Sequence, residues 1–352
     1  MASAPLMELS VETRWSKPIC IPSAGIDTGS TGIMISASSL GLSETSDFDR
    51  SRPGNEFLSS SGRLWQGYWL DANITFHTDE DECGKRQEVV TSVPIMAVTE
   101  ESICPAWKKQ GFCTERQKHN ITHWPKDIHY VGVGFGRGSS EQPDALPDKV
   151  PFINVASIGG KRADDIHQGY IITKRGVRVG LTSENTERFR KTKLDLRPGS
   201  AHNDWKMVNM SIRINDSPWN HGFALFDTGI PHSYVAVYKD VRLHAETVPS
   251  RVIRHNPPVL AEGTVVEVEV PDENGPIATY RVVAPGATGS PDPESMVPSG
   301  YVMEKDFSRE VGPHINTGRM FYNGFEVMFD SQCGWFGLFE ISGTKERLSD
   351  DL

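Results

Sequence analysis

The amino-acid sequence predicts a mostly β protein built from two related halves. Sustained helical periodicity is scarce along the 352 residues, and short runs rich in Val, Ile, Phe and Tyr recur between clusters of Gly, Pro, Asn and Asp. An apolar segment that ends in Asp-Thr-Gly occurs at Asp27 and again at Asp227, 200 residues later. The 37% hydrophobic content is ample for a folded core.

Several runs along the chain have the length and composition of strands. β-branched and aromatic residues dominate them, and turn-forming residues border them. The predicted strands include Gly67–Phe76, Val89–Thr99, Val131–Phe135, Tyr170–Leu181, Lys206–Ile214, Val252–Ile253, Thr264–Val270, Thr279–Val283 and Phe325–Phe329.

Pro-rich and charged segments separate these runs. They lie at 138–150, 160–168 and 285–298. The first and the third are typical of solvated surface loops, whereas the middle one is the natural boundary between two lobes. We therefore expect an N-terminal lobe at 1–160, which carries Asp27, and a C-terminal lobe at 161–352, which carries Asp227.

The charge balance limits the classes of partner. The chain has 46 acidic and 36 basic residues, for a formal net charge of -10. This excess of negative charge disfavours nucleic acid or an anionic membrane as the main partner, and it suits an enzyme that works at low pH. No run of 18 apolar residues occurs, so no membrane-spanning helix is predicted.

Four Asn-x-Ser/Thr sequons favour a chain that enters the secretory pathway. They lie at Asn73, Asn120, Asn209 and Asn215, and Pro218 makes the last of these a poor acceptor. Residues 1–15 contain acidic and basic side chains where a signal peptide needs an unbroken apolar core, so no signal peptide is predicted.

The five cysteines indicate one disulfide at most by local spacing. Cys104 and Cys113 are close enough to close a loop around CPAWKKQGFC. Cys20, Cys83 and Cys333 belong to no Cys-x-x-Cys pair and lie beside no His pair, so we expect thiols there and no metal site.

The two Asp-Thr-Gly triplets are accompanied by further landmarks in the same order. The first lies in AGIDTGSTGIMIS at 24–36 and the second in ALFDTGIPHSYV at 224–235. A Gly-containing apolar strand follows each of them, YVGVGFG at 130–136 and INTGRMF at 315–321. One such triplet is an ordinary turn, but two in register indicate a paired site.

Two carboxylates in contact can divide the work of hydrolysing a peptide bond with water. One takes a proton from the water and the other donates a proton to the carbonyl oxygen. Like charges about 3 Å apart cannot both ionise comfortably, so the pair shares one proton and presents an acid beside a base. Asp27 and Asp227 are the predicted catalytic pair.

The rest of each triplet has a supporting task. Gly29 and Gly229 lack a Cβ, so backbone amides can approach the carboxylates and hold them. Thr28 and Thr228 have stiff side chains with one hydroxyl each, suited to hydrogen bonds that cross-link the two loops.

The residue after each triplet differs between the halves. Ser30 is placed to donate a hydrogen bond to the outer oxygen of Asp27, which would favour the ionised form, whereas Ile230 cannot do this for Asp227. This difference favours Asp27 as the base of the pair.

The chain resembles the pepsin-like aspartic peptidases over most of its length. Besides the triplets, TGRMFYNGFEVMFDSQCGWFGL at 317–338 is similar to the last strands of that family, and YVG at 130–132 is similar to the strand that threads the loop of the first lobe. PIMAVTE at 94–100 resembles the strand after the flap, the hairpin that covers the substrate in that family. WKMVNMSIRIND at 205–216 fits the approach to the second triplet.

This resemblance implies two related β-barrel-like lobes with a cleft between them. It implies an endopeptidase that binds an extended polypeptide in that cleft and hydrolyses it at acidic pH, with water activated between Asp27 and Asp227. No cofactor and no metal are expected, and the protein is expected to be a monomer. With the sequons, the resemblance also implies a secreted or vacuolar glycoprotein.

The sequence departs from the family pattern at three places. Residues 1–23 lack the usual Tyr and Gly-Thr-Pro turn, so we expect the N-terminal edge of the first lobe to be absent or replaced. The hairpin at 57–69 has Phe57, Leu58 and Trp65 but no Tyr at the expected flap position. INTG at 315–318 lacks an apolar pair before its Gly, which predicts a more loosely threaded second loop.

A second hypothesis is a catalytically inactive binding or inhibitor-like protein on the same fold, with Ile230 and the altered flap as its signatures. A single-lobe dimeric peptidase is disfavoured, because one chain already supplies both triplets.

The sequence has no HExxH, Gly-x-Ser-x-Gly or GKS/GKT motif. DEDE at 79–82 lacks EF-hand spacing and is typical of a hairpin tip, and VGVGFGRG at 131–138 is predicted as strand rather than nucleotide loop.

Overall fold

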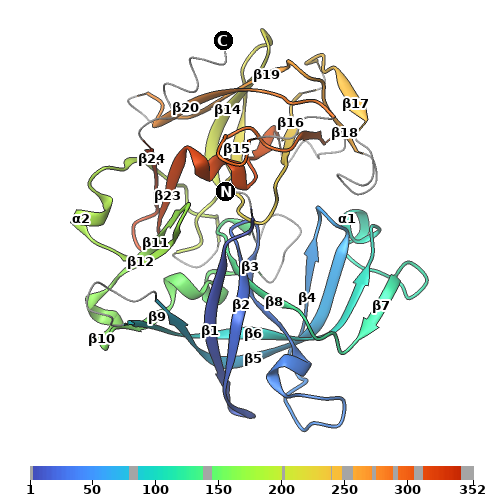
Figure 1. The fold of residues 1–352 in the computed structure, drawn as a ribbon, viewed down its shortest axis with the longest axis vertical. Coiled ribbons are helices and arrows are strands. Elements are labelled where there is room, and N and C mark those ends of the chain that lie inside the picture. Colours follow the sequence, from blue (N-terminus) through green and yellow to red (C-terminus); the bar gives the residue numbers. More distant parts are fainter. Residues whose placement is uncertain are drawn as a thin grey trace. The chain divides into compact units, whose positions relative to one another are not determined.

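The fold is mostly β, as the sequence predicts. A computed structural model describes residues 3–78, 86–137, 145–199, 203–238, 240–247, 257–271, 275–287, 292–304 and 312–341. Of the described residues, 51% are in strands and 8% in helices, and the strands form barrel and half-barrel sheets (Figure 1). The predicted strand Val252–Ile253 and the DEDE segment lie outside the described residues.

The chain divides into two compact units. The first unit comprises Pro5–Gln168 and Ser200–Asp204. The second unit comprises Gly169–Gly199 and Trp205–Leu352, together with Met1–Ala4. Each Asp-Thr-Gly triplet lies in a different unit.

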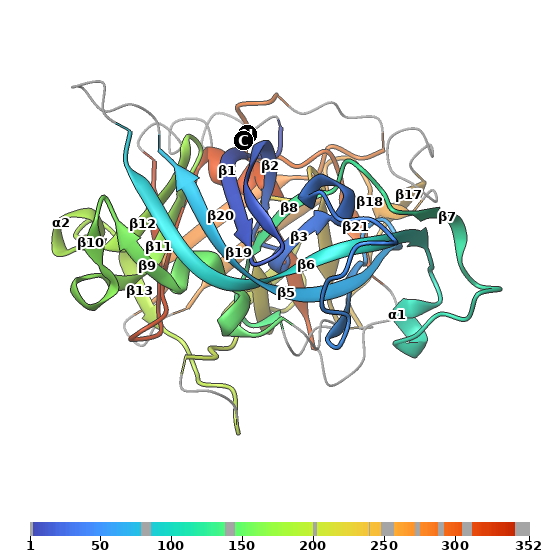
Figure 2. The ribbon, with the colours of Figure 1, turned by 90° about the horizontal axis from the view of Figure 1, so that it is seen from below.

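A ten-stranded sheet forms the first unit. Its strands are β1 (Leu6–Thr13), β2 (Ser16–Asp27), β3 (Thr31–Ser36), β4 (Pro53–Leu58), β5 (Arg63–His77), β6 (Glu88–Ile103), β7 (His119–His123), β8 (His129–Val133), β9 (Val155–Ile158) and β10 (Lys161–Arg162). They follow the order β10-β9-β6-β3-β8-β2-β1-β5-β4, with β7 on β6. Because β5 also pairs with β6, the central six strands close into a ring, and β5 and β6 appear as long curved strands in Figure 2.

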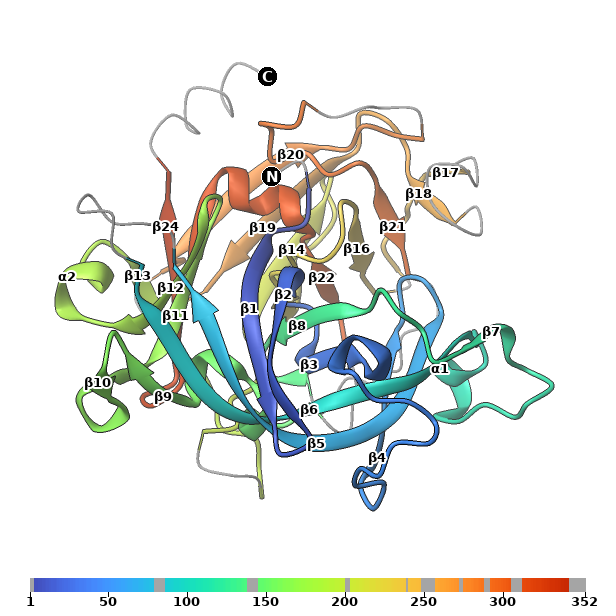
Figure 3. The same cartoon turned by 60° about the horizontal axis from the view of Figure 1, so that its bottom comes forward.

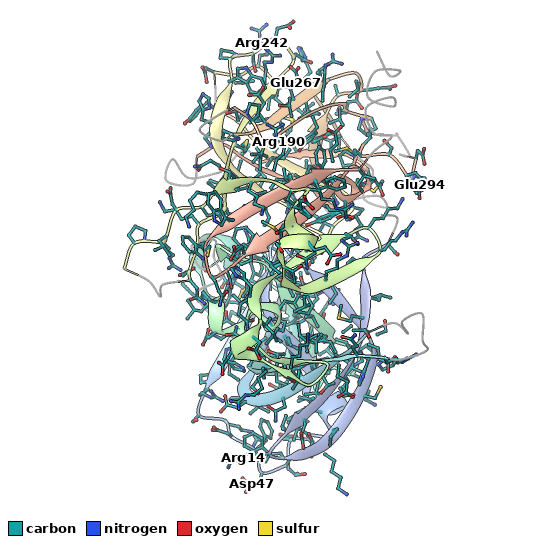
Figure 4. All side chains as sticks on the ribbon, turned by 90° about the vertical axis from the view of Figure 1, so that its left-hand side faces the viewer. Arg14, Asp47, Arg190, Arg242, Glu267 and Glu294 are labelled. Atoms are coloured by element: carbon teal, nitrogen blue, oxygen red, sulfur yellow. A yellow bond between two sulfur atoms is a disulfide. The ribbon has the colours of Figure 1, made fainter. Side chains whose placement is uncertain are left out.

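The N-terminal edge of the first unit is present, so its expected absence is wrong, whereas its replacement relative to the family pattern stays a prediction. β1 and β2 form an antiparallel hairpin that turns between Thr13 and Ser16, with Arg14 in the turn (Figure 4). Leu9 and Val11 are fully buried and alternate with polar residues, which is the period of a half-buried strand. Pro22 lies where the β1–β2 register shifts, a position at which a missing N–H is tolerated.

The expected flap is a hairpin of β4 and β5. The two strands pair from Pro53 with Tyr68 to Leu58 with Arg63, and Gly62 adopts a left-handed φ of 66° in the turn. The turn end of the hairpin packs in a cluster of Phe57, Leu64, Cys104 and Trp107. The predicted disulfide between Cys104 and Cys113 is confirmed.

The second unit contains two sheets. The larger has nine strands in the order β17-β18-β21-β16-β22-β15-β14-β19-β20, and the smaller has five in the order β12-β11-β23-β24-β13. The strands are β11 (His167–Thr173), β12 (Gly176–Leu181), β13 (Arg190–Lys193), β14 (Val208–Ile214), β15 (Asn220–Leu225), β16 (Ser233–Ala236), β17 (Ala245–Thr247), β18 (Pro258–Leu260), β19 (Val265–Val270), β20 (Ala278–Val283), β21 (Tyr301–Met303), β22 (His314–Asn316), β23 (Phe325–Asp330) and β24 (Trp335–Glu340).

The two large sheets repeat one strand order. In the first unit β2 pairs in parallel with β8, β8 pairs antiparallel with β3, and β3 pairs in parallel with β6. In the second unit β15, β22, β16 and β21 pair in the same way; β16, β21 and β22 are labelled in Figure 3. The neighbours β1 and β5 likewise match β14 and β19, all antiparallel. The internal duplication inferred from two triplets therefore extends to six strands.

Helices are short in the described part of the chain. They are α1 (Trp107–Gln110), α2 (Ser183–Thr186) and the 3₁₀ helices η1 (Ala37–Leu40), η3 (Pro147–Lys149), η4 (Pro151–Ile153), η5 (Ala163–Asp165) and η6 (Arg319–Asn323). Within the described ranges, none has the length and apolar character needed to cross a membrane. The run predicted at Tyr170–Leu181 is two strands, because the Thr173 hydroxyl accepts hydrogen bonds from the Arg175 and Gly176 N–H groups and so stabilises a turn.

Candidate active site

The first carboxylate loop comprises residues 27–31 and begins at the end of β2. Asp27 is the last residue of that strand and is only 7% exposed. The Gly29 N–H donates to Asp27 Oδ1 over 2.6 Å, and Ser30 Oγ lies 3.2 Å from Oδ2. The carboxylate is thus fixed by a backbone amide on one oxygen and a hydroxyl on the other. Thr28 is buried beside it.

Strand β8 and the residues after it thread this loop. The Gly134 N–H donates to the Ser30 carbonyl over 2.7 Å, and the Thr31 hydroxyl donates to the Gly134 carbonyl over 2.7 Å. A Cβ on Gly132 would lie 2.7 Å from the Thr31 nitrogen, which is too close for any side chain. Glycine is therefore required where the strand passes through the loop.

Tyr130 is a further partner of the first carboxylate, and the sequence did not single it out. It lies on β8, beside Gly25 of β2, and its hydroxyl donates a hydrogen bond to Asp27 Oδ2. Ser30 Oγ is 3.0 Å from the same phenol oxygen. The available signal was the YVG motif itself, in which a Tyr occupies a position two residues before the threading Gly132.

Trp65 of the β4–β5 hairpin packs against Tyr130. The two rings meet edge to face with centroids 5.1 Å apart, and the Trp65 indole N–H donates to Glu101 over 3.3 Å. Trp65 is 5% exposed and belongs to a cluster with Met34, Trp69, Met96, Val98 and Ile128. The hairpin therefore contributes an aromatic ring that packs against Tyr130, the partner of the first carboxylate. It lacks the Tyr that the family has at its flap.

The second carboxylate loop comprises residues 227–231 and follows β15. Asp227 is 5% exposed, and the Gly229 N–H donates to its Oδ1 over 2.6 Å, as Gly29 does for Asp27. Thr228 is fully buried. The cross-linking role expected of the two threonines stays a prediction.

Asn316 takes the place of a hydroxyl at the second carboxylate. Its side-chain amide donates from Nδ2 to Asp227 Oδ2 over 2.6 Å. Its Oδ1 accepts from the Gly318 N–H over 3.0 Å. The orientation of the amide follows from these two contacts, because a flipped amide would set its oxygen against a carboxylate and its NH₂ against an N–H.

The second loop is threaded with the same kinds of hydrogen bond as the first, so the expected looser threading is wrong. The Arg319 N–H donates to the Ile230 carbonyl over 2.8 Å, and the Ser233 hydroxyl donates to the Thr317 carbonyl over 2.6 Å. Gly318 has a φ of 66°, and a Cβ there would lie 2.5 Å from the His232 carbonyl oxygen. Polar side chains before Gly318 are accommodated because Asn316 has partners on both sides.

His232 is the main titratable neighbour of the second carboxylate. Burial lowers the pKa of His232 from 6.5 to about 4; the Asp227 carboxylate opposes this shift and the Arg319 guanidinium adds to it. Its Nε2 has no hydrogen-bond partner among the described residues. Burial raises the pKa of Tyr234, whose ring packs 5.1 Å from that of His232. His232 is therefore neutral over most of the mildly acidic range.

No protein-family model matches the chain, and no curated protein matches it at a significant level. The function has to be inferred from the chemistry of the two carboxylate loops.

Proposed function

We propose that the protein is an aspartic endopeptidase in which Asp27 and Asp227 form one catalytic pair. The observation that carries the proposal is the duplicated loop. Asp27 ends a strand and Asp227 follows one by two residues. Each accepts a 2.6 Å hydrogen bond from the glycine two residues later, and each loop is threaded by a glycine-containing strand. A pair of turns with no common task would not need the same backbone contacts twice.

The chemistry follows from sharing one proton between two carboxylates. The ionised member removes a proton from a water molecule as the water oxygen attacks the peptide carbonyl carbon, and the protonated member donates to the carbonyl oxygen. The Gly29 and Gly229 amides hold the carboxylates in place, so little reorganisation is needed during the reaction. The substrate class is an extended polypeptide, and the pH range is acidic because one proton must remain on the pair.

The experiment is cleavage of a denatured protein at roughly pH 3 to 5 by the whole chain, with and without pepstatin. Asp27→Asn and Asp227→Asn are each expected to reduce cleavage by at least about a thousandfold, because each removes one of two groups that act as a unit. Asp71→Asn is the matched control, since Asp71 is an exposed carboxylate in the first unit, paired only at the surface with Arg52. Equal residual activity in all three variants would contradict the proposal.

A second candidate, an inactive binding protein on the same architecture, is favoured by one feature. The outer oxygen of each carboxylate already has a side-chain partner, Tyr130 at Asp27 and Asn316 at Asp227. Pepstatin binding without cleavage at any pH would support this candidate, because it would mean a formed but unproductive site.

A further inference from the structure

Tyr130 and Asn316 occupy equivalent positions in the two units. Each lies two residues before the threading glycine, and each is on the strand that runs parallel to the one leading to the aspartate. Each reaches Oδ2, the oxygen that the backbone amide leaves open. The two side chains differ in chemistry, however, and this difference separates the two carboxylates.

Asn316 can only donate to Asp227. Its amide oxygen is occupied by the Gly318 N–H, so the NH₂ group is what faces the carboxylate, and an NH₂ group has no lone pair to offer an acidic proton. A protonated Oδ2 at Asp227 would therefore lose this 2.6 Å hydrogen bond. Asn316 also supplies the donor that Ile230, at the position of Ser30, cannot supply.

The partners of Asp27 can reverse their roles. Tyr130 and Ser30 present hydroxyl groups, and a hydroxyl both donates and accepts. When Asp27 is ionised, the Tyr130 O–H points at Oδ2. When Oδ2 carries a proton, the Tyr130 oxygen can accept a hydrogen bond from it, and the Tyr130 O–H can turn toward Ser30, whose oxygen is 3.0 Å away. This hydroxyl pair accommodates either state of Asp27.

We propose that the shared proton resides on Asp27 and that Asp227 is the base, with Asn316 and Tyr130 as the positioning residues that fix this order. The inference rests on the proposed function, and it reverses the assignment that Ser30 and Ile230 suggest from the sequence. During the reaction, a water O–H bond breaks as its oxygen bonds to the carbonyl carbon. Its proton passes to Asp227, and the proton of Asp27 passes to the carbonyl oxygen.

The other charged neighbours of Asp227 act in the same direction or are neutral. The Arg319 guanidinium donates to the Gly229 carbonyl over 2.5 Å and favours a negative charge in this loop. His232 is neutral above pH 4 or so and becomes a second cation below that. Tyr234 stays protonated because burial raises its pKa. The Glu304 carboxylate forms a 2.6 Å hydrogen bond with His314. In the first unit, the Glu101 carboxylate binds Arg63 and also Trp65, whose ring packs against Tyr130.

The test is the pH dependence of kcat/KM for peptide cleavage by the whole chain. Asn316→Leu removes the donor that favours ionised Asp227, so the acidic limb is expected to move up by about one pH unit. Tyr130→Phe is expected to leave the acidic limb in place and to change only the alkaline limb. Ile230→Thr added to Asn316→Leu returns a hydroxyl to Asp227 and is expected to bring the acidic limb back down.

A second variant removes the donor with a smaller side chain. Asn316→Ala loses the NH₂ group without bringing a bulky apolar group against Asp227, so its acidic limb should also move up even if Asn316→Leu fails to fold. A Tyr130→Phe variant whose acidic limb moves up, beside an Asn316 variant whose limb does not, would overturn the proposal.

A direct measurement keeps this inference separate from the proposed function. The protein is labelled with ¹³C at the aspartate carboxyl carbons, and the two signals are assigned with Asp27→Asn and Asp227→Asn. In the singly protonated state, Asp227 is expected at the shift of a carboxylate and Asp27 at that of a carboxylic acid. The opposite pattern overturns the inference, whereas absence of cleavage with the expected pattern overturns only the peptidase function.

Discussion

At the scale of single residues, His232 makes the free energy of unfolding depend on pH. In the folded protein its pKa is about 4, below the 6.5 of the unfolded chain. As pH falls from 6.5 toward 4, the unfolded state takes up a proton that the folded state does not, so the free energy of unfolding decreases. The free energy of unfolding falls by about 3 kcal/mol in total once the pH is below both pKa values of His232.

His232→Phe keeps an aromatic ring against Tyr234 and removes this titration. We expect its free energy of unfolding to change less between pH 6.5 and 4 than that of the wild type, as measured by urea denaturation at several pH values. His119→Phe, at an exposed position on β7, is the control. Identical pH dependence in wild type and His232→Phe would contradict the assigned role.

Gly132 tests the threading of the first carboxylate loop. A methyl group there would meet backbone atoms of Ser30 and Thr31 closer than 3.0 Å, and backbone cannot move aside without displacing the loop. Gly132→Ala is expected to destabilise the protein by about 2 kcal/mol or more and to abolish cleavage. Gly25→Ala is the control, because the nearest atom to its new Cβ lies at 4.0 Å. Thermal unfolding of both variants measures the difference.

The β1–β2 hairpin is the element on which the first unit depends most directly. β1 joins β2 to β5 and so completes the ring of strands. Leu9 is fully buried in it, and Leu9→Ala is expected to cost about 2 to 5 kcal/mol in unfolding free energy. Glu12→Ala, on the exposed side of the same strand, should change it by less than about 0.5 kcal/mol. If Leu9→Ala changes the free energy of unfolding as little as Glu12→Ala does, the hairpin contributes little to the stability of the first unit.

The disulfide fastens the turn end of the β4–β5 hairpin. Its loop spans a sequence separation of 9, so replacing Cys104 and Cys113 by Ser is expected to lower the free energy of unfolding by about 2 to 3 kcal/mol. Cys20→Ser, at an exposed free thiol, should have little effect. Hydrogen exchange of β4 and β5 amides would locate the loss, and unchanged protection there would contradict the fastening role.

At the scale of the whole molecule, the proposed function implies that one chain supplies both catalytic carboxylates. We expect specific activity to be independent of protein concentration, and we expect a mixture of the Asp27→Asn and Asp227→Asn proteins to remain inactive. Activity regained on mixing would mean that two chains share a site, as in a single-lobe dimeric peptidase.

The sequence predicted those features whose signal is local. Short runs rich in β-branched and aromatic residues, bordered by turn-forming residues, predicted β5, β6, β8, β14, β19, β20 and β23, although the turn at Lys174 was missed. The spacing of Cys104 and Cys113 predicted their disulfide. The duplication was visible because each triplet and its glycine-containing strand recur in the same order, and the pairing of six strands in each unit extends it.

The hairpin at the N-terminus was missed for an identifiable reason. The expectation for the N-terminal edge followed from the family pattern, whereas the signal for the hairpin is the alternation of Leu9, Val11 and Thr13 with polar residues. Period-2 burial is a physical requirement of a strand, whereas a particular Tyr or turn sequence is not.

The sequence by itself determined the class of the fold, the two aspartates and the glycines beside them, because each of these depends on residues close together in the chain. The tertiary structure alone decided what touches the outer carboxylate oxygens. Tyr130 is 103 residues from Asp27, and Asn316 is 89 residues from Asp227. Both reach their aspartates only because a parallel strand places them alongside, and strand pairing over such distances leaves no local pattern from which the contact could be predicted.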